Sequence, residues 1–466
     1  MTTSELTDWS ARGLAAAIAR RDVSALEVVE AHLERIDRQT TNAVVTIADD
    51  ARDAAMRADA ALARDEPVGA LHGVPFTAKD VLDTAGTRTT AGSELFRDFV
   101  PARDAAAVVA MRAAGAILVG KTNCPEFALE PRATNRVFGA TTNPFDPALG
   151  PGGSSGGCAA AVAGGLTPLS LGTDYGGSVR FPAHCTGTFG LRPTPGRVAA
   201  GGQRPTPPAG TPRDLFSLVG PIARTSDDLR LALAVLGGPA TRPAGSGAPL
   251  ACAWAGGEGS VVVPPDLVAA VERAAAALAD RGHEVVAAAP PGLERAHPLF
   301  GELRATDDYA DLVALAGGRA HLLTPRICSL LADAPPRPDL DGRAEVGEFL
   351  ARRPILLLPV AAVPSFPLGS VELEVAGTRH VVDAMTILAP CRAVSLLGLP
   401  AASVPAGVTD AGLPVGVQVV GRAGHDGDVL TVAAELEAAL GGWQPPPQAA
   451  GSTSRTLHGA PHSSTS

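Results

Sequence analysis

Long hydrophobic runs, an excess of positive charge and closely spaced cysteines are all missing from this chain of 466 residues. No apolar run reaches the roughly 18 residues that a membrane-spanning helix needs, so no membrane span is expected. The N-terminal segment has no basic region followed by an apolar block, which excludes a recognisable secretory signal. Lys and Arg total 38 against 48 Asp and Glu, a net charge of -10, with no basic cluster. Such a chain is poorly suited to binding nucleic-acid phosphates.

The six cysteines form no C-x-x-C pair and have no metal-ligand spacing. They are scattered along the chain as Cys124, Cys158, Cys185, Cys252, Cys328 and Cys391. This usage predicts reduced, mostly buried thiols in a cytoplasmic protein, with no metal and no organic cofactor.

Lysine is scarce as well, because only Lys79 and Lys121 occur among the basic residues. Arginine replaces lysine almost everywhere else, so the two retained lysines are candidates for a task that arginine cannot perform. Releasing a proton is such a task, since a guanidinium stays charged in proteins. The alternative is that chance and packing alone keep either lysine.

Hydrophobic residues make up 46% of the chain, which indicates a globular protein with a sizeable core. Helical periodicity marks 4–38 and Ala51–Arg64, and Ser24 with Glu27 forms a capping-box pattern. From Gly69 onward, short apolar runs alternate with helical patterns, which predicts an α/β sheet covered on both faces. The expected strands include Val74–Ala78, Ala116–Val119, Leu166–Leu171, the region of Val360, and Leu413–Val420.

Two glycine-rich segments, at 151–157 and 172–182, are the strongest local signals. The first, PGGSSGG, enters a helical pattern as a phosphate-binding loop would. A P-loop requires lysine after its last glycine, whereas Gly157 is followed by Cys158 and Ala159. This excludes a nucleotide site of that type and leaves a structural turn as the alternative for either segment alone.

Taken together with LHGVPFTAKD around Lys79, the segments PGGSSGG and GTDYGGSVRFPA resemble the amidase signature family of serine hydrolases. The spacings agree with the family, with 75 residues from Lys79 to Ser154 and 24 from Ser154 to Ser178. Matching segments cover most of 10–240 and resume over about 354–440, including GLRPTPGRV and GLPVGVQVVG. Residues 240–350 match loosely.

The resemblance implies a single large α/β/α domain, residues 1–444, around a twisted mixed sheet of about eleven strands. Its parts are the N-terminal helices (4–64), a catalytic core (65–240), a variable substrate-specificity region (240–350) and the rest of the core (354–440). Residues 445–466 are rich in Pro, Ser, Thr and Gly and are predicted to form a disordered tail.

By this resemblance Ser178 is the nucleophile, Lys79 the base, and Ser154 the relay between them, with a cis peptide bond to its neighbour. The base must lose its proton near neutral pH, so the pKa of Lys79 has to fall by roughly three units from about 10.4. Burial among the apolar residues before it would produce this shift, with Asp80 pointing away as the next residue of a strand.

The resemblance also assigns supporting roles to residues around these three. The backbone amides of Tyr175, Gly176, Gly177 and Ser178 form the expected oxyanion hole. Ser155 and Arg180 are expected to support the catalytic residues, and Thr173 and Asp174 to hold the nucleophile loop.

Five residues are candidates for the substrate pocket: Cys124, Ala128, Leu129, Tyr175 and Phe181. For Tyr175 two interpretations stay open, since its ring either packs over the acyl group or braces the loop.

The resemblance favours an amidase that hydrolyses a linear carboxamide to an acid plus ammonia or amine, with a small molecule as substrate. One alternative is the glutaminase component of a tRNA-dependent amidotransferase, although such proteins usually carry Gln where this chain has Phe181. Another is a catalytically inactive scaffold on the same fold. A homodimer through the N-terminal helices is a further hypothesis.

Overall fold

A single eleven-stranded sheet organises the computed structural model, which describes residues 6–238, 249–305, 310–324, 327, 343–375, 377–382 and 386–447. The strands lie in the order β1 (Val44–Ile47), β3 (Ile117–Thr122), β2 (Pro75–Lys79), β6 (Leu169–Asp174), β8 (Leu218–Ala223), β7 (Phe189–Arg192), β14 (Ala401–Val408), β15 (Pro414–Gly421), β11 (Ile355–Pro359), β9 (Ala251–Trp254) and β10 (Glu284–Ala287). The predicted sheet of about eleven strands is confirmed.

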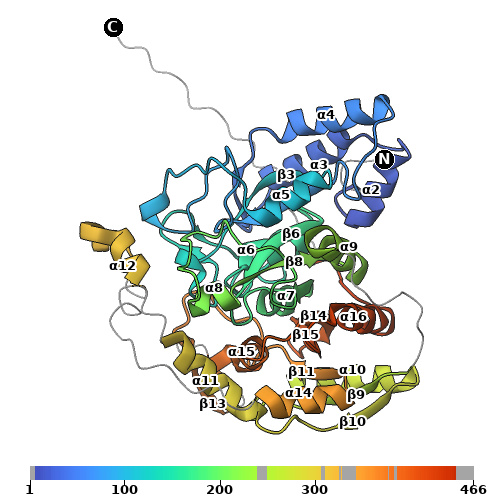
Figure 1. Ribbon diagram of the computed structural model, residues 1–466, viewed down its shortest axis with the longest axis vertical. Helices are drawn as coiled ribbons and strands as arrows, with labels where there is room; N and C mark the ends of the chain where they lie inside the picture. The colour runs from blue at the N-terminus through green and yellow to red at the C-terminus, as the bar shows by residue number, and fades with distance from the viewer. Residues whose placement is uncertain are drawn as a thin grey trace.

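The sheet is mixed in direction. Its parallel groups are β3-β2-β6, beside the antiparallel edge strand β1, and β11-β9-β10 at the other edge. The strands between them run antiparallel to their neighbours. Strands from both ends of the sequence therefore share one sheet, which crosses the molecule from the blue strands, past the red β14 and β15, to the yellow β9 and β10 in Figure 1.

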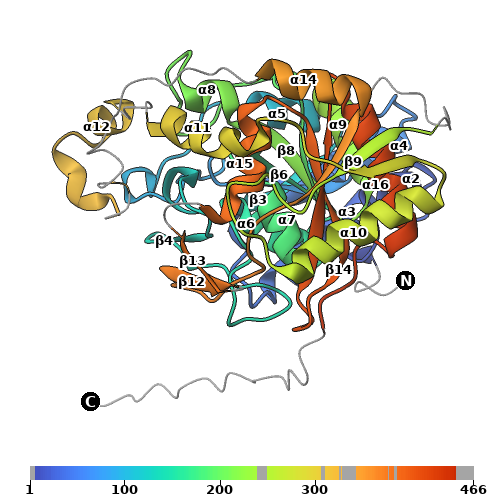
Figure 2. The ribbon, with the colours of Figure 1, turned by 90° about the horizontal axis from the view of Figure 1, so that it is seen from below.

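Helices cover both faces of this sheet, as the α/β/α prediction requires. The helices α9 (Ser226–Gly237), α16 (Asp426–Leu440) and α10 (Pro265–Asp280) lie along one face, and α6 (Gly156–Ala163), α7 (Arg180–Thr186) and α15 (Ala389–Leu396) along the other (Figures 1 and 2). Helix α6 is buried along its whole length, which explains its run of Gly, Ala and Val.

The N-terminal helices agree with the sequence pattern. They are α2 (Ala11–Ala19), α3 (Ala25–Asp37) and α4 (Ala51–Ala63), and α3 begins with the predicted capping box between Ser24 and Glu27. Their apolar positions, such as Leu14 and Ile18, are fully buried.

The remaining elements are short or peripheral. They are α5 (Ala106–Ala113), α8 (Pro212–Phe216), α11 (Leu293–Ala305), α12 (Ala310–Ala316), α14 (Arg343–Arg352) and the two-stranded ribbons β4 (Thr134–Asn135) with β5 (Gly139–Ala140) and β12 (Glu372–Val375) with β13 (Thr378–Val381). Short 3-10 turns lie at Glu94–Phe96, Glu126–Ala128, Gly317–Leu322 and Thr386–Leu388. Among the described helices, none is long and apolar enough to cross a bilayer.

The loosely matching region 240–350 contributes regular structure where it is described. Its strands β9 and β10 extend the sheet at one edge, and α11 packs against α15. The predicted tail falls largely outside the described residues, since the description ends at 447.

The site is positioned by two parallel neighbours, β2 and β6, which pair through Ala78 and Leu171. Lys79 is the last residue of β2 and Asp174 the last of β6. Because parallel neighbours end at the same edge of a sheet, the loops that follow them meet there. The chain between Asp174 and α7 carries Ser178.

Candidate active site

Lys79 lies at the carboxyl end of a strand whose five residues are all buried. Its Nζ donates hydrogen bonds to Ser154 Oγ (2.7 Å) and Thr173 Oγ1 (2.8 Å). Burial lowers the pKa of Lys79 to about 8, because removal from water disfavours the charged form. The lowered pKa agrees in direction with the prediction. A part of the Lys79 population therefore carries a neutral amine near neutral pH.

Asp80 and Lys121 occupy a separate polar cluster. The Asp80 carboxylate accepts hydrogen bonds from the amide (3.1 Å) and hydroxyl (2.5 Å) of Thr90. The Lys121 ammonium donates to Thr84 Oγ1 (3.1 Å), Thr89 Oγ1 (2.8 Å) and the carbonyl of Leu82. Lys121 thus links β3 to the segment that follows β2, and these contacts give it a structural role.

The loop before α6 carries Ser154 and Ser155, both buried. The Gly153–Ser154 peptide bond is cis, in agreement with the resemblance. A Cβ on Gly153 would lie 2.2 Å from the amide nitrogen of Arg132, so only glycine fits there. Ser155 ties the neighbouring loops together, since its amide donates to the Ser178 carbonyl (3.0 Å) and its hydroxyl bonds the Thr173 backbone (3.2 Å).

Ser178 lies between β6 and α7 and lines the same cavity as Ser154 and Thr173. Gly177 before it has φ +118°, and a Cβ there would lie 2.6 Å from Cys391 Cβ. The Gly177 amide donates to Asp174 Oδ1 (2.8 Å) and is therefore directed away from an oxyanion role. This hydrogen bond corrects the prediction that four backbone amides form the oxyanion hole. The amides of Tyr175, Gly176 and Ser178 are left as candidate donors.

The Asp174 carboxylate holds the loop that carries Ser178. Arg180 donates to its carboxylate through Nε (3.0 Å) and an η nitrogen (2.9 Å), and Arg192 lies 3.4 Å away. Burial alone would raise the pKa of this carboxyl, but the two guanidinium groups hold that pKa well below its usual range. Arg180 also donates to Ser395 Oγ (2.8 Å) and to Gln418, which connects the loop to α15 and β15.

The Asp174→Asn variant is expected to lower the free energy of unfolding by about 3–5 kcal/mol, because two buried guanidinium groups lose their counter-charge. Urea denaturation followed by circular dichroism measures this loss. Asp227→Asn is the matched control, since its ion pair with Arg12 spans 3.9 Å and both side chains are more than 60% exposed. The control is expected to change stability by less than about 1 kcal/mol. Equal effects of both variants would contradict this account.

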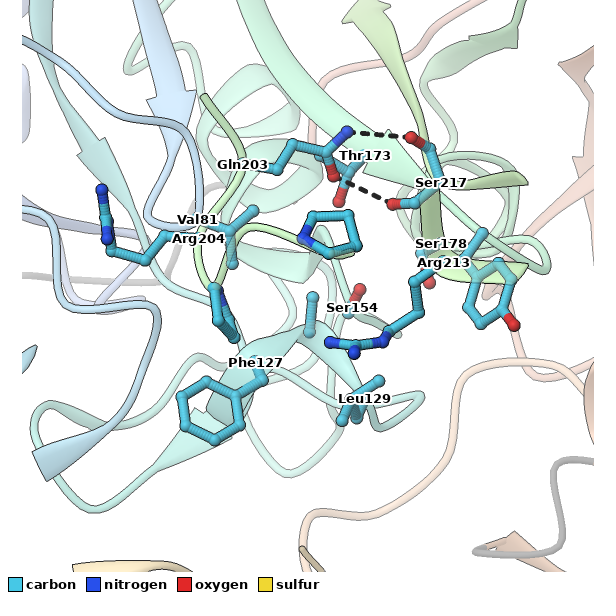
Figure 3. A pocket seen from close by; sticks show the side chains of 14 residues that line it. Val81, Phe127, Leu129, Ser154, Thr173, Ser178, Gln203, Arg204, Arg213 and Ser217 are labelled. Carbon is cyan, nitrogen blue, oxygen red and sulfur yellow. Dashed lines mark hydrogen bonds between the residues drawn. The ribbon is translucent and has the colours of Figure 1, made fainter. Parts of the chain in front are cut away.

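The cavity is lined in part as the sequence predicted, since Ala128, Leu129 and Tyr175 belong to its wall. A second wall of the cavity, formed by the segment 203–217, was not predicted from the sequence. This wall consists of Gln203, Arg204, Pro205, Pro207, Arg213 and Ser217. Gln203 and Ser217 exchange two hydrogen bonds, 2.8 Å and 2.9 Å, drawn as dashed lines in Figure 3. The two arginines of this Pro-rich stretch, Arg204 and Arg213, were the available signal.

Cys124 and Phe181 do not line this cavity, which corrects two predictions. Cys124 is fully buried in the main core, and burial raises the pKa of its thiol. Phe181, the second residue of α7, points into another apolar cluster and stacks on Phe366 with ring centroids 6.2 Å apart. Both side chains are fully buried and pack in the interior.

Tyr175 makes the contact that the loop-bracing interpretation requires. It lines the cavity, and its ring packs against Phe300 of α11 with centroids 5.3 Å apart. The guanidinium of Arg392 lies over the Phe300 ring, 4.8 Å from its centroid. The ring of Tyr175 thus braces the loop against α11 and also forms part of the wall.

Within the described part of the chain, no group of three or more His, Cys, Asp or Glu side chains is arranged to hold a metal ion. The chemistry available to the cavity is that of hydroxyl groups, a buried amine, backbone amides and arginine.

Comparisons with known proteins agree with this geometry. The family model described as Amidase matches residues 27–340 and 339–430. The chain is 33% identical to the A-type subunit of the glutamyl-tRNA(Gln) amidotransferase of Salinispora tropica, covering 95% of this chain and 99% of that protein. It is 31% identical to the indoleacetamide hydrolase of Bradyrhizobium diazoefficiens, covering 92% and 86%. A solved bacterial aryl acylamidase of the amidase signature enzymes superposes with a TM-score of 0.82 at 27% identity, covering 92% and 96%. With the family model spanning most of its length, this chain belongs to the amidase signature family.

Proposed function

We propose that this protein hydrolyses the C–N bond of a carboxamide through an acyl-enzyme on Ser178. The observation that carries the proposal is the 2.7 Å hydrogen bond from the buried Lys79 amine to Ser154, in a cavity that Ser178 also lines. An amide is a poor electrophile, so its cleavage needs an activated hydroxyl, a base and donors for the oxyanion. Ser154, Thr173 and Ser178 line one cavity, and the buried Lys79 amine is linked to it through the hydrogen bond to Ser154, which supports the proposal.

In the proposed reaction, neutral Lys79 takes the proton of Ser154 while Ser154 takes that of Ser178. The Ser178 oxygen then bonds to the carbonyl carbon, and the carbonyl electron pair moves to oxygen. Amides of Tyr175, Gly176 and Ser178 are the candidate donors to this oxyanion, and losing one such donor typically costs about 10²–10³ in rate.

The second half of the reaction returns the protons. As the tetrahedral intermediate collapses, the leaving nitrogen receives a proton through Ser154 and departs as ammonia or amine. Water then attacks the acyl-enzyme, giving its proton to the same relay, and Ser178 is restored with release of the acid. The second hydrogen bond of Lys79, to Thr173 Oγ1, holds the amine beside Ser154 throughout.

Two biochemical roles are compatible with this chemistry, and they differ in substrate. Similarity over nearly the whole length to A-type amidotransferase subunits favours a glutaminase that works within a complex. Phe181, in place of the Gln usual in such proteins, favours an amidase that acts alone, as does similarity to an indoleacetamide hydrolase.

Ammonia release by the purified chain distinguishes the glutaminase from the independent amidase. The assay uses glutamine, aliphatic amides and aryl amides, with and without a serine-directed fluorophosphonate. Turnover of non-glutamine amides by the chain alone supports the independent amidase, whereas turnover of glutamine only supports the glutaminase. No ammonia from any amide, together with no fluorophosphonate labelling, would indicate the inactive scaffold and contradict the proposal.

Activity is expected to rise with pH because the neutral amine is the working form of Lys79. Burial lowers the pKa of Lys79 to about 8, so kcat/KM should increase through pH 8 and level off above it. The measurement is kcat/KM from pH 6 to 10 for one amide, corrected for the folded fraction at each pH. A profile that falls across this range would contradict the role of Lys79 as base.

A further inference from the structure

Helix α11 brings part of the region 240–350 to the active site. It packs against α15 and α8, and Figure 2 shows the three helices side by side. Two buried side chains of α11, Phe300 and Arg304, contact the wall of the cavity. The Phe300 ring packs on Tyr175, and an η nitrogen of Arg304 donates to the Leu129 carbonyl (3.2 Å). One helix thus supports two separate segments of the cavity wall.

The contact between Phe300 and the loop 175–178 is close. The ring centroids of Phe300 and Tyr175 are 5.3 Å apart. A Cβ on Gly176 would lie only 3.1 Å from Phe300 Cζ and 3.2 Å from Arg392 Cγ, so the Gly176 backbone lies against both side chains. Arg392 also covers the Phe300 ring, with its guanidinium 4.8 Å from the ring centroid. The loop therefore has little space to move toward α11.

The same loop is held by hydrogen bonds from Asp174. The Asp174 carboxylate accepts from the amides of Gly177 (2.8 Å) and Val179 (3.1 Å). Within the described part of the chain, the amides of Gly176 and Ser178 donate to no protein acceptor. Two amides without a partner, in a loop fixed by Asp174 and by Phe300, are suited to an oxyanion, because donors that are already in place need no reorganisation during the reaction.

We propose that Phe300 is a positioning residue for the hydrolysis, and that its ring holds the peptide groups of Tyr175 and Gly176 in the direction that the oxyanion requires. This inference rests on the proposed acyl-enzyme on Ser178 and adds a residue that lies outside the glycine-rich motifs. Of the described residues, Phe300 is not among those that line the cavity. It acts through the loop, so its loss should affect the transition state and not the binding of substrate.

The first test is truncation of the ring. Phe300→Ala should lower kcat by about 10- to 100-fold, since a displacement of about 1 Å at a reacting group costs about 10²-fold. KM should change by less than about threefold, as expected for an interaction made only in the transition state. Phe300→Leu keeps an apolar contact and should give a kcat between those of the wild type and Phe300→Ala. The rates are measured per folded molecule, quantified by circular dichroism.

Phe349→Ala is the matched control. Phe349 packs on the same apolar cluster as Phe300, but it lies on α14, whereas Phe300 supplies the ring contact of Tyr175. The control should lower the thermal unfolding temperature and leave kcat per folded molecule near that of the wild type. An equal loss of kcat in Phe300→Ala and Phe349→Ala would overturn the specific role of Phe300.

A double-mutant cycle tests the contact itself. Gly176→Ala places a methyl group against Phe300 and should lower kcat by about tenfold or more, because it displaces the loop. In the Phe300→Ala chain the methyl group has space, so adding Gly176→Ala should cost much less than it does in the wild type. Losses that simply multiply would show that Phe300 does not position Gly176.

Fluorophosphonate labelling gives a readout that does not depend on turnover. In this reaction the Ser178 oxygen bonds to phosphorus and fluoride leaves, while the phosphoryl oxygen takes the place of the carbonyl oxygen. Phe300→Ala should slow labelling, and the rise of activity through pH 8 should stay, because the Lys79 contacts are unchanged. Wild-type kcat and labelling rate in folded Phe300→Ala, or in Phe300→Leu if the alanine variant does not fold, would overturn the role of Phe300 alone. Absence of turnover and labelling in the wild-type chain would instead overturn the proposed function.

Discussion

Ser178→Ala is expected to lower kcat/KM for amide hydrolysis by roughly 10⁴–10⁶-fold, as loss of the nucleophile does in other serine hydrolases. The hydroxyl forms the covalent bond, and the alanine side chain has no atom that replaces it. Because Ser178 lies on a loop held by Asp174 and by Ser155 through backbone contacts, the fold should persist. The measurement is ammonia release, with the thermal unfolding temperature determined in parallel.

Ser217→Ala provides the matched control, because Ser217 lines the same cavity and its hydroxyl contacts Gln203. We expect it to change kcat/KM by less than about tenfold, the loss of one ordinary hydrogen bond. A Ser178→Ala variant that folds normally and still turns over amides at a comparable rate would exclude the acyl-enzyme on Ser178.

Lys79→Arg should be nearly as damaging, with a loss of roughly 10³–10⁴-fold, the size of a general-base contribution. Arginine keeps the positive charge in a fully buried position but does not release a proton near neutral pH. Lys79→Ala is expected to retain more activity than Lys79→Arg, because it leaves space for water instead of a fixed cation. The rates are measured per folded molecule, quantified by circular dichroism.

The Lys121→Arg variant is the control for Lys79→Arg. It distinguishes the loss of a catalytic base from the poor fit of a larger cation in a buried site. Lys121 is also fully buried and donates to Thr84, Thr89 and the carbonyl of Leu82. Arginine at this site should lower the yield of folded protein, while kcat per folded molecule stays near that of the wild type. Near-normal turnover by Lys79→Arg, or loss of chemistry per folded molecule in Lys121→Arg alone, would show that the Lys79–Ser154–Ser178 relay is wrong.

The family resemblance on which the proposed catalytic residues rest is visible in the sequence because its motifs are local. Glycines precede Ser154 and Ser178 where the backbone must turn tightly or approach another segment, and Lys79 is one of only two lysines. The sheet and the buried helices could be predicted because apolar periodicity reports burial.

The walls of the cavity could not be predicted in the same way. Arg213 and Gln203 lie in an irregular Pro-rich segment whose contact with the loops is made only by the folded chain. Phe181 and Cys124 adjoin the family motifs in sequence, yet their side chains are buried in apolar clusters and do not line the cavity. Proximity along the chain does not fix the direction of a side chain. Nor could the sequence show that the Gly177 amide is directed to Asp174.

Locating a trapped adduct shows whether Ser178 forms the covalent intermediate. The chain is incubated with a fluorophosphonate, digested, and the modified peptide is sequenced by tandem mass spectrometry. We expect one modification, on Ser178, which Lys79→Arg slows and Ser178→Ala abolishes. An adduct on Ser155 or Cys124 in the wild-type chain would contradict it.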